Sequence, residues 1–332
     1  MYVVHSYPLA VVFCVLTMLC WGSWANSRKL ADPGWRFELF YWDYTLGVLL
    51  LTLVLGLTLG SAGTEGRAFL PDLAQASTAS LASALLGGAL FNLGNILLVA
   101  GIEIAGMAVA FPVGVGLALV IGVIMNYVAT PVGNGPLLAA GVLLVSLAIV
   151  LDAVAYRRLS SGTGGVSARG LILSVASGIF MGTFYRFVAA AMYADAAHVE
   201  AGKMSNYAAV FVFAVGVFLS SFVWNTFAMK RPVAGPPVGF ADYFRGKGGN
   251  HLAGVFGGVV WGTGMSFNLI ASGRAGFAIS YGLGQGATMI AAFWGVFIWK
   301  EFSAAPAGTS KLLAAMFACF LSGLAIIVLA RS

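Results

Sequence analysis

Long apolar stretches, separated by short polar ones, run through the whole of this 332-residue chain. A helix that crosses the hydrocarbon core of a bilayer needs about 20 mostly apolar residues. Ten segments meet that requirement: 7–27, 38–60, 78–100, 104–127, 134–156, 168–192, 204–229, 250–272, 275–299 and 311–330. The pattern predicts an all-α membrane protein with ten transmembrane helices, including two tight hairpins that turn at Gly101 and at Gly273.

Glycines recur at a fixed distance along the chain. Six glycines of the third and fourth apolar segments return 170 residues later in the eighth and ninth: Gly87, Gly88, Gly94, Gly106, Gly114 and Gly116 match Gly257, Gly258, Gly264, Gly276, Gly284 and Gly286. Repeated apolar halves with glycine-interrupted helices are typical of secondary transporters. We therefore interpret residues 1–160 and 161–332 as two five-helix repeats within one membrane domain.

Basic residues divide unevenly between the two ends of these helices. The loops after the first, fifth, seventh and ninth segments hold 12 of the 17 lysines and arginines, whereas the opposite end holds four. The positive-inside rule then places both termini outside the cell and the central loop, Arg157 to Arg169, in the cytoplasm. Because each half has an odd number of helices, we expect the second half upside down, which makes two inverted repeats in the plasma membrane.

The composition excludes several classes of protein. Charged residues make up only 8% of the chain and the mean hydropathy is +0.95, too apolar to cover a water-facing surface. The net charge of +6 lies mainly in short loops, which indicates orientation in the membrane rather than nucleic-acid binding. The histidines (His5, His198 and His251) lie in loops or at helix ends, and neither H-E-x-x-H nor G-K-[ST] occurs. We therefore expect no metal site, no cofactor and no enzyme activity.

Two corresponding helices carry glycine-rich stretches near their middle. They read Phe111-Pro112-Val113-Gly114-Val115-Gly116 and Tyr281-Gly282-Leu283-Gly284-Gln285-Gly286. Small residues let neighbouring helices approach closely, and proline removes a backbone donor, so these stretches fit either plain helix packing or two bent helices beside a cavity. In the second interpretation Tyr281, Gln285 and Thr288 share one helix face.

Amides and indoles supply further candidates within the spans. Asn92 and Asn95 share a face of the third helix, and Asn268 lies in the eighth helix after Trp261. A buried amide can bond a neighbouring helix, which is worth about 0.6–2 kcal/mol, or it can contact a ligand. Trp21 and Trp24 flank Gly22, and their rings suit either aromatic packing or stacking on a flat solute.

Two of the charged residues inside predicted spans are candidates for a functional role. Asp43 is near the start of the second helix, and Asn206 in Ser205-Asn206-Tyr207 resembles it in the second half. A carboxylate costs about 2.5–3.5 kcal/mol at the centre of a span, so Asp43 is either a hydrated helix-start residue or a group that binds a coupling proton. Arg186 lies in the sixth helix near the other side of the membrane, where it can extend to the interface.

Short motifs along the chain resemble the drug/metabolite transporter superfamily, and within it most closely the ureide permease family. They are Met1-Tyr2-Val3-Val4, Asp43-Tyr44-Thr45-Leu46, Asn92-Leu93-Gly94-Asn95, and Phe293-Trp294-Gly295 followed by Glu301-Phe302. The resemblance implies proton-coupled uptake of a small polar, nitrogen-rich solute such as allantoin or a nucleobase. The glucose/ribose porters and rhamnose–proton symporters share this plan, which leaves a monosaccharide as the alternative.

We therefore expect a secondary active transporter, ahead of a drug or metabolite exporter or a channel. Its partners would be a small solute and the lipid bilayer, with no nucleic acid, and the chain would act as a monomer or a homodimer. Asp43 would bind the coupling proton. The residues expected around the solute are Trp21, Trp24, Asn92, Asn95, Phe111, Trp261, Asn268, Tyr281 and Gln285.

Overall fold

The computed structural model describes residues 1–159 and 167–331. Within these residues, ten helices are long and apolar enough to cross a membrane, as the apolar pattern predicts. The elements are α1 (Tyr7–Ser23), the 3-10 turn η1 (Trp24–Leu30), α2 (Phe37–Leu57), α3 (Phe69–Gln75), α4 (Thr78–Ala105), α5 (Met107–Ala129), α6 (Gly135–Leu159), α7 (Ala168–Ala190), α8 (Asn206–Lys230), α9 (Phe240–Phe244), α10 (Gly248–Ala275), α11 (Phe277–Gly284), α12 (Ala287–Phe293), the π-helical turn η2 (Trp294–Ile298) and α13 (Thr309–Leu329). The boundary expected between residues 160 and 161 lies outside the described residues.

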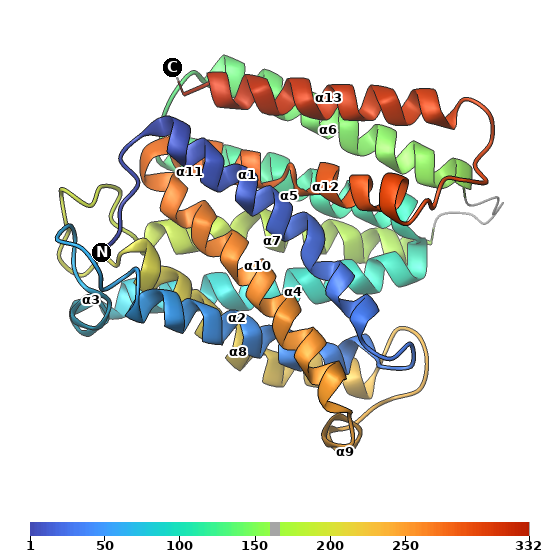
Figure 1. The fold of residues 1–332 in the computed structure, drawn as a ribbon, viewed down its shortest axis with the longest axis horizontal. Helices are drawn as coiled ribbons and strands as arrows, with labels where there is room; N and C mark the ends of the chain where they lie inside the picture. Colours follow the sequence, from blue (N-terminus) through green and yellow to red (C-terminus); the bar gives the residue numbers. More distant parts are fainter. Residues whose placement is uncertain (160–166, 332) are drawn as a thin grey trace.

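Each half of the chain packs mainly on the other half. The helix α1 lies against α10, α11 and α12, while α7 lies against α4 and α5. In the same way α2 packs on α10 and α8 packs on α4, and the last helices of the two halves, α6 and α13, pair with each other (Figure 1). The two halves therefore exchange equivalent contacts.

Glycines allow the two central helix crossings. A side chain at Gly88 of α4 would collide with the backbone of α8 at Phe213, and one at Gly258 of α10 would collide with the backbone of α2 at Tyr44. The partner helices carry glycines at the same crossings, Gly216 on α8 and Gly47 on α2. In lipid, helices associate chiefly by such close packing, because lipid tails are as apolar as the helix surfaces.

The hairpin turns lie a few residues beyond the predicted positions. The backbone turns at Gly106 and Gly276, with φ of +76° and +85°, and not at Gly101 and Gly273. A positive φ is a conformation that favours glycine, and Gly106 and Gly276 are one of the pairs that repeat at 170 residues. Gly276 packs against Val132, beyond the end of α5 that is remote from Gly106, so the two hairpins turn at opposite ends of the bundle.

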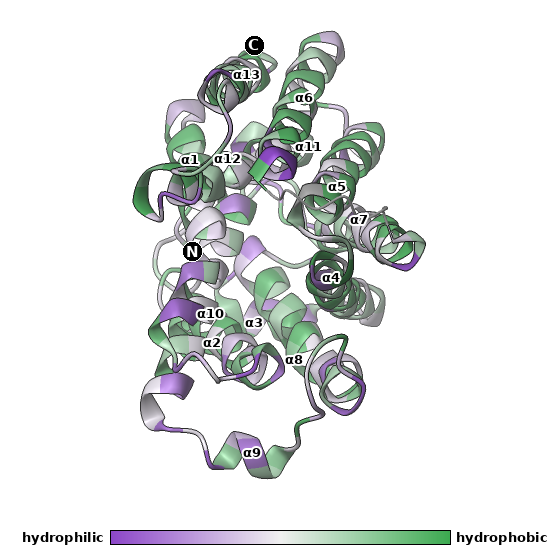
Figure 2. Ribbon diagram, turned by 90° about the vertical axis from the view of Figure 1, so that its right-hand side faces the viewer, coloured by the Kyte–Doolittle hydropathy of each residue, from purple (hydrophilic) through white to green (hydrophobic). Residues whose placement is uncertain are grey.

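The helices differ between the halves in one respect. The helix α5 continues through Pro112, whereas its counterpart is interrupted after Gly284 and resumes at Ala287. The sequence predicts that Tyr281 and Thr288 share one helix face. The interruption instead places Tyr281 in α11 and Thr288 in α12. The loop from Lys230 to Asn250 also contains the short helix α9, which Figure 2 places at the edge of a bundle that is largely hydrophobic.

The glycine crossings predict a position-specific effect on stability. Alanine in place of glycine inside a helix gains about 0.5–1 kcal/mol when the site is open, whereas overpacking costs about 1–3 kcal/mol. We expect Gly258→Ala to lower the unfolding temperature in detergent, because its methyl group meets the α2 backbone. The matched control Gly249→Ala lies in the same helix with open space around it and should be neutral or stabilising. Equal melting curves would contradict this account of the crossing.

Candidate functional site

Aromatic rings gather where the two crossings meet. Trp261 of α10 is at their centre, with ring centroids 4.5 Å from Phe91, 5.8 Å from Trp21, 6.1 Å from Phe213 and 6.2 Å from Tyr44. The rings come from α1, η1, α2, α4, α7, α8 and α10, so both halves contribute. We refer to the following residues as the aromatic cluster: Trp21, Trp24, Tyr41, Tyr44, Phe91, Phe184, Phe213 and Trp261.

The aromatic cluster corrects one correspondence between the halves. Tyr44 stands three residues before Gly47, and Phe213 stands three residues before Gly216, and each meets the glycine of the crossing helix. In this register the counterpart of Asp43 is Val212. Asn206, which the short Ser-Asn-Tyr motif had suggested, lies at the start of α8 instead. The Ser-Asn-Tyr motif suggests the wrong counterpart, because the crossing glycines fix how α2 and α8 align and a polar residue before a tyrosine does not.

Two polar atoms in the aromatic cluster have no hydrogen-bond partner among the described residues. They are the indole Nε1 of Trp21 and the hydroxyl of Tyr44, both buried. The other hydroxyl on this face of α2 is occupied, because the amide of Asn95 donates to Tyr41 at 3.1 Å. Leaving a buried polar group unpaired costs about 1–3 kcal/mol, so two unpaired donors within one cluster suit a polar ligand.

The structure brings some of the expected solute-binding residues together. Trp21, Trp24 and Trp261 are members of the aromatic cluster, and Asn95 reaches it through Tyr41. Tyr281 contacts the cluster at its edge, with its ring centroid 6.4 Å from that of Phe184. Tyr44 was not among the expected residues, although it follows Asp43 directly in the sequence.

Two of the expected amides instead join helices. Asn92 donates to the Val217 carbonyl and to two serine hydroxyls of α8. Asn268 accepts from Tyr185 at 2.7 Å and donates to the Ser280 carbonyl at 2.8 Å, which links α10 to α7 and α11. Both contacts match the packing role that was left open for a buried amide.

The remaining expected residues lie apart from these contacts. Gln285 is half-buried at the interruption between α11 and α12. Phe111 is half-buried and makes no ring contact with the aromatic cluster in the part of the chain that is described. Arg186 is half-buried near the end of α7 and forms no ion pair within residues 1–159 and 167–331.

Asp43 is buried near the start of α2 and has two hydrogen-bond partners. Its carboxylate accepts from the Tyr243 hydroxyl at 2.6 Å and lies 2.9 Å from Nδ1 of His251. Tyr243 comes from α9 and His251 from the first turn of α10. The position of His251 predicts only a residue at a helix end, and no spacing in the chain links it to a partner 208 residues away.

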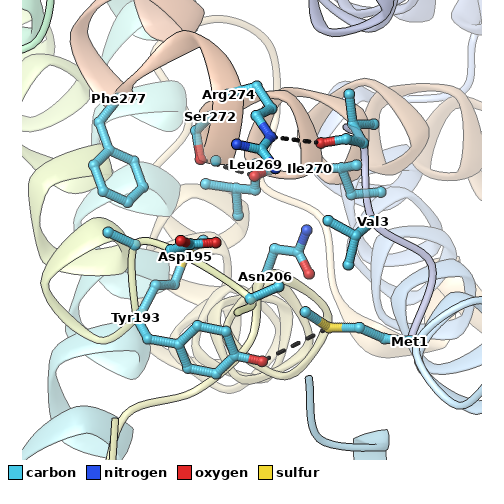
Figure 3. Close-up of a pocket in the computed structure, with 15 residues that line it drawn as sticks. Met1, Val3, Tyr193, Asp195, Asn206, Leu269, Ile270, Ser272, Arg274 and Phe277 are labelled. Carbon is cyan, nitrogen blue, oxygen red and sulfur yellow. Dashed lines mark hydrogen bonds between the residues drawn. The ribbon is translucent and has the colours of Figure 1, made fainter. Parts of the chain in front are cut away.

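A small polar cavity lies at the end of the bundle that carries both termini. Figure 3 shows it with Tyr193, Asp195, Asn206, Ser272 and Arg274 among its lining residues. Its volume of about 40 Å³ holds two or three water molecules at most, so it is too small for an organic solute. Burial raises the pKa of Tyr193 to about 12, so its hydroxyl keeps its proton beside Met1. The unpaired donors make the aromatic cluster the better candidate site.

The comparisons of this sequence with known proteins agree on one family. A sequence profile described as ureide permease matches residues 40–163 and 157–330. Ureide permease 1 of Arabidopsis thaliana is 22% identical over 99% of this chain and 98% of its own length, and ureide permease 4 of the same plant has the same identity and coverage. A solved crystal structure shares the fold, with a TM-score of 0.61 and 19% identity over 98% of this chain and 99% of the other.

The hydroxyls of two buried tyrosines should differ in their effect on stability. Tyr185→Phe removes the partner of Asn268 and leaves its amide oxygen buried and unpaired, which we expect to cost about 1–2 kcal/mol. Tyr44→Phe removes a hydroxyl that has no partner here, and it should leave the unfolding temperature in detergent unchanged or slightly higher. A larger loss for Tyr44→Phe would mean that its hydroxyl supports the fold.

Proposed function

This chain belongs to the ureide permease family of membrane transporters, and we propose that it is a secondary active transporter that brings a small polar, nitrogen-rich solute into the cell together with protons. The curated relatives are described as ureide permeases, which supports a ureide such as allantoin, or a chemically similar nucleobase, as the solute. In this proposal the protein lies in the plasma membrane with both termini outside.

The observation that carries the proposal is the pair of unpartnered donors within the aromatic cluster. The Trp21 Nε1–H and the Tyr44 hydroxyl can donate to carbonyl oxygens, which ureides and nucleobases carry in abundance. The Asn95 amide donates to Tyr41 and so keeps its oxygen as an acceptor for a solute N–H. The ring faces of Trp261 and Trp21, tilted by only 13°, suit a flat heterocycle.

The exchanged packing of the two halves supports alternating access. The aromatic cluster lies where α2 crosses α10 and α4 crosses α8, at the contact between the halves. In transporters built from inverted repeats, the solute site lies near the midplane at the repeat interface, and one bundle rocks against the other around it. We assign the same role to this crossing, with the two hairpins that turn at Gly106 and Gly276 reversed in the membrane.

The proposed solute contacts predict a loss of affinity without a loss of fold. In proteoliposomes, Tyr44→Phe should weaken solute binding about three- to tenfold, since it removes one hydrogen bond, and Asn95→Ala should do the same. Counterflow of radiolabelled allantoin measures this, because only a carrier exchanges labelled for unlabelled solute. Tyr127→Phe is the matched control, since its hydroxyl meets the Gly133 carbonyl in an exposed position.

A thermal-shift panel distinguishes the solute classes in advance of transport. A ligand at 100 times its Kd stabilises the folded protein by about 2.7 kcal/mol. Allantoin, uracil or xanthine should raise the unfolding temperature, and this shift should shrink in Tyr44→Phe. Stabilisation by a monosaccharide alone would replace the ureide assignment with the sugar alternative.

Proton coupling through Asp43 predicts a transport defect that differs from the loss of solute affinity. A carboxyl group that carries the proton must titrate, so Asp43→Asn should abolish accumulation driven by a pH gradient while sparing exchange at equal solute concentrations. Asp152→Asn is the control, because Asp152 is also buried but lies in α6. Normal accumulation by Asp43→Asn, or its loss in Asp152→Asn alone, would move the coupling group away from α2.

A further inference from the structure

The segment that carries α9 covers the end of α2 where Asp43 is buried. The guanidinium of Arg36 donates to the carbonyls of Ala234 and Pro236, each at 2.8 Å, and fixes the start of this segment. Phe240 packs on Trp42 with ring centroids 5.5 Å apart. The helix lies at the end of the bundle opposite the two termini, on the side predicted to be cytoplasmic (Figure 1).

Tyr243 and His251 close Asp43 off from water. Asp43 is 2% exposed, whereas the His251 side chain is 26% exposed, so the imidazole stands between the carboxylate and the solvent. The His251 ring is held edge-on by Tyr243 at 4.7 Å and by Trp35 at 5.4 Å. Gly254 lets α10 come close enough for this contact, because a side chain there would meet Cβ of Asp43.

One proton decides whether this arrangement is neutral. With one proton shared, the Asp43–His251 pair is either a carboxylate with an imidazolium or a carboxylic acid with an imidazole, and neither form leaves a net charge. When that proton leaves, a carboxylate remains that only neutral donors contact. An uncompensated buried charge costs several kcal/mol, which is relieved only if water reaches it.

Tyr243 and His251 lie between Asp43 and the solvent on this side. Burial and the hydrogen bond to Asp43 raise the pKa of Tyr243, so the tyrosine stays a neutral donor and cannot supply the missing charge. Loss of the proton therefore favours a state in which Tyr243 leaves the carboxylate and α9 moves away from α2.

We propose that Asp43 and His251 form a two-residue proton site, and that Tyr243 is a positioning residue that latches α9 over it. This inference rests on the proposed function as a proton-coupled carrier. The protonated pair keeps the predicted cytoplasmic end closed, and release of the proton to solvent through His251 opens it. The proton is the only species transferred, from the Asp43–His251 pair to water.

The other charged groups around this site do not provide the switch. Asp32 is paired with Lys247 at 3.0 Å, and this contact lowers the pKa of the Asp32 carboxyl further below neutrality. Glu38 is paired with Arg36 at 2.7 Å, and Asp242 accepts from the Gly239 amide within its own loop. The remaining charges on the elements packed here are lysines and arginines: Arg28, Lys29, Lys230, Arg231 and Arg245.

The test uses a cysteine beneath the latch in the full-length protein. Met229 is 1% exposed, its sulfur accepts from Trp42, and its carbonyl accepts from Val238 of the covering segment. In a variant without Cys14, Cys20 and Cys319, we expect maleimide to label Met229→Cys about tenfold faster at pH 8 than at pH 6, after division by the rate for Phe244→Cys. Phe244 is 78% exposed, so its rate corrects for the reactivity of the thiol itself.

Three variants separate the latch from a structural role. With Tyr243→Phe, maleimide should label Met229→Cys fast at every pH. With Asp43→Asn or His251→Gln, the labelling rate should lose its difference between pH 6 and pH 8, which we call the pH step. A pH step that survives in His251→Gln, or slow labelling of Tyr243→Phe at pH 6, would overturn the inference.

The labelling needs no solute, so its outcome is distinct from that of the transport assays. A normal pH step in a protein that carries no solute would retain the latch and reject the proposed function. Proton-driven accumulation that depends on Asp43 but shows no step in labelling would retain the function and reject the latch.

Discussion

The close approach of backbones at two glycine crossings is the constraint on which the rest of this structure depends. Without side chains at Gly88 and Gly258, α4 and α10 come into direct contact with α8 and α2. A bilayer provides no hydrophobic force between helices, so this packing must supply the association energy. The same two crossings bring Phe91, Trp261, Tyr44 and Phe213 together, since each ring stands within one turn of a crossing glycine or on the facing helix. The site is thus a consequence of the scaffold's tightest contact.

The ten helices could be predicted because the thickness of the bilayer imposes their length and apolar character directly. The glycine repeat also pointed to helices that prove to be the central ones. The turns were harder to place, because Gly101, Gly106, Gly273 and Gly276 are equally compatible with a hairpin in sequence, and only the path of the backbone requires a positive φ at two of them. The interruption after Gly284 had no distinct signal either, since the Pro112 of the uninterrupted copy looks the stronger helix breaker.

The residue types of the candidate site could be predicted from the sequence, but the partners that these residues contact could not. Indoles inside spans drew attention to Trp21, Trp24 and Trp261, which do meet. Asn92 and Asn95 are three residues apart on one helix, yet one bonds α8 and the other bonds Tyr41 of α2, because the two neighbouring helices approach that face from different sides. His251 had no signal in the sequence as a partner of Asp43, because a helix-end position is ordinary for histidine. The α2–α10 crossing brings the two side chains together.

The two halves share a scaffold but not its chemistry. Tyr44 of α2 corresponds to Phe213 of α8, and Asp43 corresponds to Val212. His251 of α10 corresponds to Leu81 of α4. The polar member lies each time on α2 or α10, and even Asn95 of α4 directs its amide to Tyr41 on α2. The α2–α10 crossing holds the Asp43–His251 pair, while the polar contact across the α4–α8 crossing joins the Asn92 amide to a backbone carbonyl and serine hydroxyls of α8. A symmetric scaffold can rock equally well in both directions. Placing the Asp43–His251 pair on one of the two crossings makes the two ends of the path chemically different, which a carrier driven by a proton gradient requires.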